Sequence, residues 1–499
     1  MAATTTASRV APARPAVPAR RPARSALLFW ALALALVVPV WAGTHFPTED
    51  GPAHAHWTAV YRDLGDSASA WAPYLERSVR WNAPNLSYFA LQYALTAALE
   101  PHAAQKLIVT LLLLAWAGAT ALLARAASGR LGLGAFAALL LLHSWILYSG
   151  FLSFLIGVPV LVLSVALLLD VEARRERGDA VAARTALLAL PGVVAYYSHI
   201  VTGALFVALL LLGALYFARR DARHAGALLA AALPTCLLGA SYVLGSPFGE
   251  GGAVWATFGD TVKRFVGLAF WRGFAARDAG FFLSLGLVGV TLLALCAGAV
   301  RARRRGEGSR AVDFVLLGAL CLAALYFVAP RRVGEGSLIR ERIQLVMWAV
   351  LLPALGAGLP RRARQGVAAA IALLAAWQLA DFTLRARRFD AQVAGVLAQA
   401  RGAIPAGAVF RFPQRYEDSQ FERSWVGPLV ELGSDVALHR RAVLVGAHHP
   451  LTPFYWVRYR PGADSAATLT ATIEERRAAT GRGSLTLVVR PAGRAAPAP

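Results

Sequence analysis

Residues 104–124 read AQKLIVTLLLLAWAGATALLA, an apolar stretch that decides how the rest of the chain is interpreted. A helix needs about 20 mostly apolar residues to cross a bilayer, so this stretch predicts a transmembrane helix. Ten further stretches resemble it, near 25–43, 131–148, 151–170, 184–198, 200–217, 225–245, 280–300, 311–329, 342–360 and 365–384. Residues 186–218 are too long for one helix, and Pro191 and His199 suggest a break, so ten or twelve spans are also conceivable. The sequence therefore predicts an all-α multi-pass membrane protein with about eleven transmembrane helices.

Composition excludes several other classes of protein. Of the 499 residues, 57% are hydrophobic and 16% are charged, and the formal net charge is +22. A soluble nucleic-acid-binding protein could carry that charge but not this hydropathy, so no nucleic acid is expected as a partner. A disordered chain would be far less hydrophobic. Three Cys residues are too few for a disulfide framework.

The loop charges predict an orientation, because short cytoplasmic loops are rich in Lys and Arg. If the N-terminus is cytoplasmic, the cytoplasmic loops are 1–24, 125–130, 171–184, 218–224, 301–310 and 361–364, with 22 Arg against six acidic residues when Asp170 is included. The opposite loops, 44–103, 246–279 and 330–341, are close to neutral. We therefore expect a bacterial inner-membrane protein with an uncleaved first helix and its C-terminal segment outside the cytoplasm.

This orientation divides the chain into four parts. Residues 1–24 form a cytoplasmic basic tail, 25–384 a transmembrane domain, 385–490 a small extracytoplasmic α/β domain, and 491–499 a disordered tail. Within the first external loop we expect helices at 53–64 and 85–99 at or near the membrane surface. Within the C-terminal domain we expect helices at 385–402 and 468–479 and strands at 408–412, 436–446 and 484–489.

The densest cluster of ionisable residues follows the first span and consists of His45, Glu49, Asp50, His54 and His56. Asp50 is a good N-cap for the expected helix, and His54, four residues later, would share its face. Such a pair could supply a general base or hold a divalent cation such as Mg²⁺ or Mn²⁺. The alternative is an ordinary capping Asp with solvated neighbours.

A second group of residues could bind phosphate at the same side of the membrane. The loop before the tenth span contains four Arg residues, Arg331, Arg332, Arg340 and Arg342. Arginine binds phosphate through its planar fork, although Arg at a helix end can also simply extend to the membrane interface. Lys106 could join this group. His143 and His199 are further candidates, because ionisable residues inside a membrane are often functional.

Several short stretches carry a resemblance to a known superfamily. They are FPTEDGPAH at 46–54, NLSY at 85–88, GFLSF at 150–154, and Arg340 to Arg342 before span ten. Together with the layout they resemble the C-type (GT-C) multi-pass glycosyltransferases, which include protein O-mannosyltransferases and aminoarabinose transferases. The resemblance implies a polyprenyl-phosphate-linked sugar donor, an acceptor on the outer face, and Asp50 as base or metal ligand with Glu49 beside it.

The chain departs from that superfamily in one respect. Members often place another acid in the second external loop, which here is the tight turn 148–150 without an acid. Glu250, Asp260 or Asp278 could replace it. We expect a membrane glycosyltransferase of the cell envelope. The alternatives are a transporter or lipid flippase, or a non-catalytic GT-C-like protein of envelope assembly. The sequence contains no P-loop, Rossmann glycine pattern, zinc motif or G-x-S-x-G.

Overall fold

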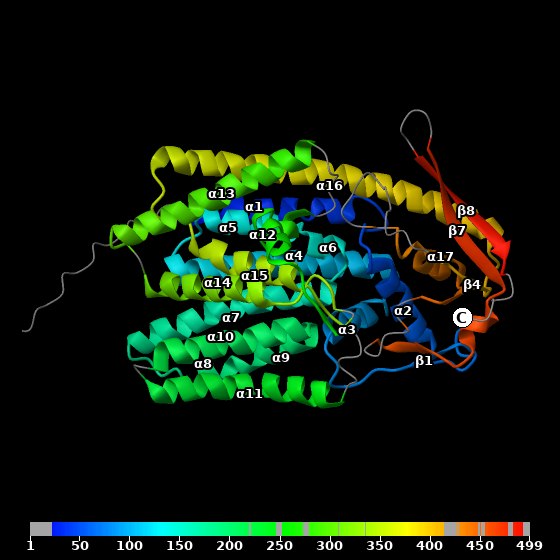
Figure 1. Ribbon diagram of the computed structural model, residues 1–499, viewed down its shortest axis with the longest axis horizontal. Helices are drawn as coiled ribbons and strands as arrows, with labels where there is room; N and C mark the ends of the chain where they lie inside the picture. The colour runs from blue at the N-terminus through cyan, green and yellow to red at the C-terminus, as the bar shows by residue number, and fades with distance from the viewer. Residues whose placement is uncertain are drawn as a thin grey trace, which may run out of the picture.

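The computed structural model describes residues 22–218, 221–245, 252–272, 279–307, 309–334, 336–413, 427, 429–447, 450, 455–477 and 483–492. All eleven predicted apolar stretches fall on helices, which run roughly parallel to one another in a bundle (Figure 1). These helices are α1 (Pro22–Ala35), α4 (Pro101–Ser128), α5 (Leu133–Leu139) with α6 (Trp145–Tyr148), α7 (Leu152–Glu176), α8 (Ala182–Leu187) with α9 (Ala189–Ser198), α10 (Ile200–Ala218), α11 (Ala222–Gly245), α13 (Ala279–Arg304), α14 (Arg310–Val328), α15 (Ile339–Ala354) and α16 (Arg361–Ala403). The break expected between the fifth and sixth stretches lies at His199.

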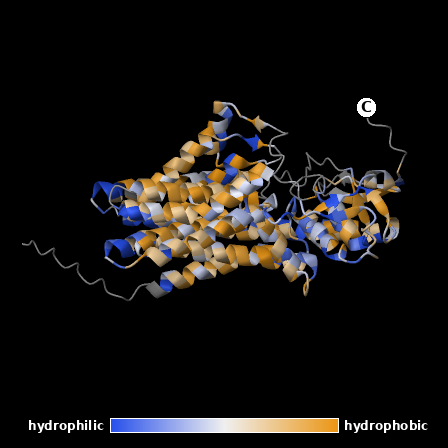
Figure 2. Cartoon of the chain, turned by 90° about the horizontal axis from the view of Figure 1, so that it is seen from below, coloured by the Kyte–Doolittle hydropathy of each residue, from blue (hydrophilic) through white to orange (hydrophobic). Residues whose placement is uncertain are grey.

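The bundle is that of a multi-pass helical membrane protein. In the described part of the chain, eight helices are long and apolar enough to cross a membrane, by length and composition. The segments α5–α6, α8–α9 and α15 are shorter. Large apolar side chains such as Leu283, Leu293 and Leu320 lie exposed on the outside of the bundle, as lipid contact requires. Figure 2 shows this apolar bundle and the more polar ends at which it stops.

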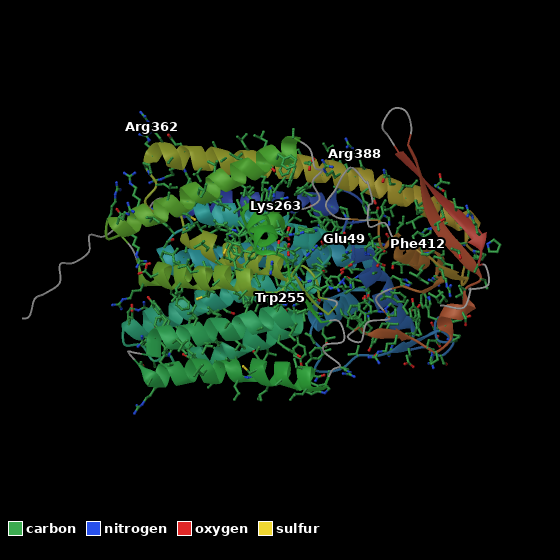
Figure 3. The ribbon with its side chains drawn as sticks, viewed as in Figure 1. Glu49, Trp255, Lys263, Arg362, Arg388 and Phe412 are labelled. Carbon is green, nitrogen blue, oxygen red and sulfur yellow. The ribbon has the colours of Figure 1, made fainter. Side chains whose placement is uncertain are left out.

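The two ends of the bundle differ. Arg362, at the start of α16, lies at one end, whereas Glu49 lies at the other, next to the C-terminal domain (Figure 3). Loops predicted to be cytoplasmic join helices at the Arg362 end (Figure 1). The separation of basic loops from the C-terminal domain is therefore as the charge pattern predicts, and the assignment of one end to the cytoplasm remains a prediction.

The first external loop lies between the bundle and the C-terminal domain. It follows η1 (Val38–Trp41), which ends the first apolar stretch, and contains α2 (Gly51–Asp63), β1 (Leu75–Arg77) and α3 (Leu86–Leu95), so both expected helices are present. That they lie at or near the membrane surface remains a prediction, but α2 does not rest on that surface as an isolated helix. This helix is mostly buried, because it packs against α3 and α4 on one side and α17 (Leu432–Arg440) on the other.

The described parts of loops 246–279 and 330–341 lie beside each other. Strand β2 (Ala253–Val254) pairs antiparallel with β3 (Arg332–Val333), and α12 (Phe258–Val266) and η3 (Ala269–Arg272) follow β2. Phe258 and Val266 of α12 are largely exposed, which suits contact with the lipid interface.

The long helix α16 joins the bundle to the C-terminal domain. Its 43 residues extend about 64 Å at 1.5 Å per residue, roughly twice the thickness of the hydrocarbon core. The helix runs through the predicted domain boundary at residue 385 without a break, and its second half lies against the C-terminal sheet (Figure 1). Gln399 fixes this contact, because its side chain bonds to Leu485 O at 3.1 Å and to Leu487 N at 2.8 Å.

The C-terminal domain has an α/β arrangement. Its sheet has the order β5-β4-β7-β8, with β4 (Val409–Arg411) parallel to β5 (Val443–Val445) and β7 (Leu469–Arg477), and with β7 antiparallel to β8 (Gly483–Pro491). A separate strand, β6 (Val457–Tyr459), pairs with β1 of the first external loop. A 3₁₀ turn, η6 (Ala463–Ala466), follows β6. The domain is therefore joined to the bundle by α16 and by the β1–β6 pair.

Two sequence predictions in this domain are wrong. The helix expected at 468–479 is strand β7, because Leu469, Ala471 and Ile473 alternate with Thr side chains at the period of a strand. The strand expected at 436–446 is mostly helix α17, and only β5 at its end is extended. The helices and strands expected at 385–402, 408–412 and 484–489 are present.

Candidate functional site

Asp50 is positioned by the short turn between α6 and α7. Glu49 N donates to Tyr148 O at 2.9 Å, and Asp50 N lies 3.4 Å from Ser149 O. Gly150, with φ of +83°, passes so close that a Cβ there would lie 2.8 Å from Asp50 N and 2.9 Å from Asp50 Cβ. The turn thus needs glycine for its left-handed backbone and for the space it leaves. Two of the stretches that carry the GT-C resemblance therefore meet in the fold.

The Asp50 carboxylate is available for chemistry. Asp50 occupies the N-cap position of α2 as predicted, but its side chain makes no capping hydrogen bond. Within the described part of the chain, no residue hydrogen-bonds to this carboxylate, although it remains partly accessible. Burial and the nearby charges of Glu49 and Glu431 raise the pKa of Asp50 well above its ordinary value, and Arg342 opposes the shift. Such a carboxylate takes up a proton more readily than an ordinary Asp.

Glu49 makes a different contact from its neighbour. Its Oε1 accepts a hydrogen bond from Gly427 N at 2.7 Å, so it ties the first external loop to the C-terminal domain. Burial raises the pKa of Glu49, and the bond from Gly427 opposes that rise. Figure 3 shows Glu49 at the junction between the bundle and the C-terminal domain. This geometry gives Glu49 a positioning role beside Asp50.

Arg342 is the predicted cation that the fold brings toward Asp50. It is buried in the first turns of α15, where its guanidinium carbon lies 4.2 Å from the ring centre of Phe151 and 5.3 Å from that of Phe154. Its Nη1 lies 2.7 Å from His199 Nε2, and its Nε is buried without a hydrogen bond to any described residue. Phe151, on which the guanidinium packs, directly follows Gly150, which lies against Asp50, so the same turn brings Arg342 and Asp50 to one site.

Arg340 is not part of this group. Two residues apart on a helix, Arg340 and Arg342 project from different faces. Arg340 Nε donates to Ala329 O at 2.7 Å, and its Nη1 bonds to Thr261 Oγ1. Arg340 therefore links α15 to the end of α14 and to α12, and its donors are used in holding these helices together.

The remaining predicted cations, Arg331, Arg332 and Lys106, also make their contacts away from Asp50. Arg331 and Arg332 are exposed on the β2–β3 pair. Lys106, on α4, donates to Gly43 O at 3.0 Å and lies 4.8 Å from the ring centre of Trp41. It therefore fixes the end of the first span against α4.

His54 lies beside Asp50 on the first turn of α2. Its Nδ1 is 3.3 Å from the hydroxyl oxygen of Tyr455, and its ring stacks at 6.0 Å on Trp456. Burial lowers the pKa of His54 to about 4, against a smaller opposing effect of a bond to the Gly150 backbone. The imidazole is consequently neutral at physiological pH. It lines the site between the first loop and the C-terminal domain.

His56 and His143 are core residues. Burial lowers the pKa of His56 to about 3, its ring packs on Trp57, and neither ring nitrogen bonds to a described residue. His143 has both nitrogens engaged, at 2.9 Å from the Tyr148 hydroxyl and 2.8 Å from Leu36 O. His143 thus contacts Tyr148, which precedes the turn that positions Asp50, and does not itself line the site.

The predicted metal site would need several donor side chains grouped around Asp50 and His54. Among the described residues, no three His, Cys, Asp or Glu side chains are grouped so that they could hold a metal ion. His54 Nδ1 faces the Tyr455 hydroxyl, which is not a usual ligand for Mg²⁺ or Mn²⁺. The described residues therefore form no three-ligand metal centre around Asp50 and His54, and a metal ion held by Asp50 remains a prediction.

Two residues of the site were missed in the sequence, Glu431 and Tyr455. Burial raises the pKa of Glu431 to about 7, with a bond from Ser434 opposing, and its charge acts on both Asp50 and Tyr455. Neither residue lies in a motif, and both come from the segment farthest from Asp50 in the chain. Only the packing of α17 and β6 on the first loop reveals them.

Of the acids considered as replacements for the missing second acid, only Asp260 lies in the described part of the chain, and it is engaged elsewhere. Asp260 pairs with Arg264 one turn later on α12, at 2.8 Å. Glu250 and Asp278 lie outside the described residues. Within the described residues, the acids whose charges act on Asp50 are its neighbour Glu49 and, from the C-terminal domain, Glu431.

Comparison with known proteins finds similarity to a solved structure. No family model and no curated protein matches the sequence. The chain is similar to the crystal structure of ArnT from Cupriavidus metallidurans bound to undecaprenyl phosphate, with a TM-score of 0.46, 15% identity, and coverage of 93% of this chain and 97% of that chain. At this level of similarity, a function has to be supported by the side chains of the site.

Proposed function

We propose that the chain is a membrane glycosyltransferase, which transfers a sugar from a polyprenyl-phosphate-linked donor to an acceptor on the extracytoplasmic face of a bacterial inner membrane. One observation carries the proposal. Asp50, whose carboxylate no described residue hydrogen-bonds, lies in one site with Arg342, whose Nε is likewise unused. A base beside a buried cation at the end of a helical bundle suits transfer from a lipid-linked phosphate.

The chemistry requires one proton acceptor and one anion-binding group. The acceptor hydroxyl or amine attacks the anomeric carbon, and a bond forms between its heteroatom and that carbon. The carbon–oxygen bond to the phosphate breaks, and its electron pair leaves with the polyprenyl phosphate. Asp50 takes the proton from the attacking group, and the guanidinium of Arg342 stabilises the negative charge that develops on the phosphate.

The surroundings of Arg342 support this assignment. Phe151 and Phe154 hold its guanidinium against their rings, so the charge has a fixed position before the donor binds. Because the site is largely shielded from water, the interaction with a phosphate is stronger there than on an exposed surface. The exposed Arg331 and Arg332 lack such a setting.

The test is a transfer assay in proteoliposomes, using purified protein and a panel of undecaprenyl-phosphate-linked hexoses and pentoses. We expect Asp50→Asn to reduce the transfer rate by about 100-fold or more, because a positioned base contributes about that much. Asp63→Asn, at an exposed position near the end of the same helix, is the matched control and should keep the wild-type rate. Equal rates for Asp50→Asn and wild type would show that the mechanism is wrong.

Metal dependence is tested in the same assay by adding a chelator. Because the described residues form no three-ligand metal centre, we propose that transfer continues after chelation. Loss of transfer on chelation, with recovery on adding Mg²⁺ or Mn²⁺, would overturn that part of the proposal. Asp50 would then be a candidate metal ligand.

A further inference from the structure

The second carboxylate near Asp50 begins a row of ionisable side chains. Glu431 precedes α17 and Asp435 lies four residues later, so the two are neighbours on one face of the helix. Ser434 Oγ donates to Glu431 Oε2 at 3.1 Å. The Glu431 charge acts on Asp50 in one direction and on Asp435 in the other. Gly427, four residues before Glu431, bonds through its N to Glu49 Oε1 at 2.7 Å, and α17 packs against α2, so Glu431 lies between the candidate base and the rest of the row.

The row continues from the C-terminal domain into α4 and the first external loop. Asp435 is 2% exposed, and its Oδ1 lies 3.3 Å from His102 Nε2. The ring centre of His102 is 4.7 Å from that of His45, and His45 Nδ1 is 2.8 Å from Asp390 Oδ1 on α16. Four separate segments thus contribute to one line of carboxylates and imidazoles.

The far end of this row opens into a cavity. The cavity has a volume of about 530 Å³ and lies between the start of α4, the second half of α16, and α17. Asp435, His102 and His45 all line it. Apart from its approach to His102 Nε2 at 3.3 Å, Asp435 Oδ1 makes no hydrogen bond to a described residue, and Asp435 lines this space. A cavity of this size, lined by these polar side chains, has room and hydrogen-bond partners for water that would exchange protons with the row.

Other charged groups also face the row and influence it. Glu49 and Arg342 act on Asp50, while Glu100 acts on both Asp435 and His102. Further charged or titratable residues near the cavity end are Lys106, Asp390, Arg401, His439 and Arg441. The acidic members outnumber the basic ones between Asp50 and Asp435. A proton is therefore favoured within this part of the row rather than excluded from it.

We propose that Glu431, Asp435 and His102 form a proton path that carries the proton taken up by Asp50 to the water-filled cavity. The proposal rests on the proposed function, which requires Asp50 to lose one proton in every cycle. The path needs no other reactant, because the proton leaves the acceptor group, passes along the three side chains and is released to water. Asp50 is then ready for the next acceptor.

The first test compares Glu431→Gln and Asp435→Asn with wild type in the transfer assay across pH. Both variants should lower kcat by about 10-fold or more, with a flattened pH profile, since proton transfer becomes limiting. Added imidazole or formate, small enough to enter the cavity, should restore part of the rate in Asp435→Asn. Glu76→Gln, at an exposed position on β1, is the matched control. Unchanged kcat and pH profile in both variants would overturn the proposal.

A second readout does not depend on transfer. Infrared difference spectra after a pH step should show a carboxyl band that disappears in Glu431→Gln and shifts in Asp435→Asn. If wild type uses no donor in the panel but this band is present, the proposed function is wrong, and proton exchange among the side chains of the row is still supported. If the band is unchanged in both variants, the proton path is wrong. Thermal unfolding in detergent shows whether either variant is misfolded. If one is, the result for the other variant decides whether the proton path is correct.

Discussion

Replacing Gly150 by Ala tests whether the turn between α6 and α7 positions the candidate base. With φ of +83°, Gly150 has a backbone conformation that costs an L-residue about 1–2 kcal/mol. The added Cβ would also lie 2.8 Å from Asp50 N, so Asp50 or the turn must move by about 0.6 Å to reach an ordinary contact. Misplacement of 1 Å in a catalytic site costs about 100-fold, so we expect a loss in kcat of about 10-fold or more.

Gly178→Ala is the matched control for backbone strain. Gly178 has φ of +85°, and nothing lies within 4 Å of the position of its Cβ. The free energy of unfolding, measured by thermal unfolding in detergent, should therefore fall by about 1–2 kcal/mol in Gly178→Ala and by more in Gly150→Ala, where the overlap with Asp50 adds to the backbone strain. The transfer rate should fall only in Gly150→Ala. The reasoning is refuted if Gly150→Ala transfers sugar at the wild-type rate, or if the two variants lose activity to the same extent.

Two further predictions concern charged residues of the site. Arg342→Lys should raise KM for the lipid-linked donor by about 10-fold, because Lys lacks the planar fork and stacks less well on Phe151. The exposed Arg332→Lys is the control and should behave as wild type. Equal KM values for Arg342→Lys and wild type would count against phosphate binding by Arg342. The pKa of Glu431 is raised from 4.5 to about 7, so its stabilising contribution is complete below pH 4.5 and is lost as pH rises through 7. Relative to Glu431→Gln, wild type should lose about 3 kcal/mol of unfolding free energy over that range, and parallel stability curves would contradict this.

The bundle could be predicted from the sequence because its signal is local. Each membrane helix needs its own apolar stretch, and each stretch is read without knowledge of the others. The helices and strands of the C-terminal domain have no such local signal in the sequence. Residues 469–477 contain Glu and Arg, which favour helices, and their short alternation of apolar and Thr side chains becomes a nine-residue strand where β4 and β8 pair with it. Tertiary pairing decided the structure of this segment, and a single sequence does not display it.

The candidate site was predictable only in part, for the same reason. Asp50 followed from the dense cluster after the first span, and Arg342 from the Arg-rich loop before α15. Sequence alone could not separate Arg342 from Arg340, because the difference depends on which helix face meets α12. Glu431 and Tyr455 had no sequence signal at all. Their role depends on α17 and β6 lying against a loop almost 400 residues earlier.

The C-terminal domain therefore contributes to the site as well as covering it. Gly427 holds Glu49, and the Tyr455 hydroxyl lies 3.3 Å from His54, so both positioning contacts cross the same interface. That interface also removes Asp50 from bulk water, and burial is the largest cause of its raised pKa. Position and proton affinity of the base thus have one structural origin. Weakening the interface should lower the pKa of Asp50 and loosen its position together, so neither property can be changed there without the other.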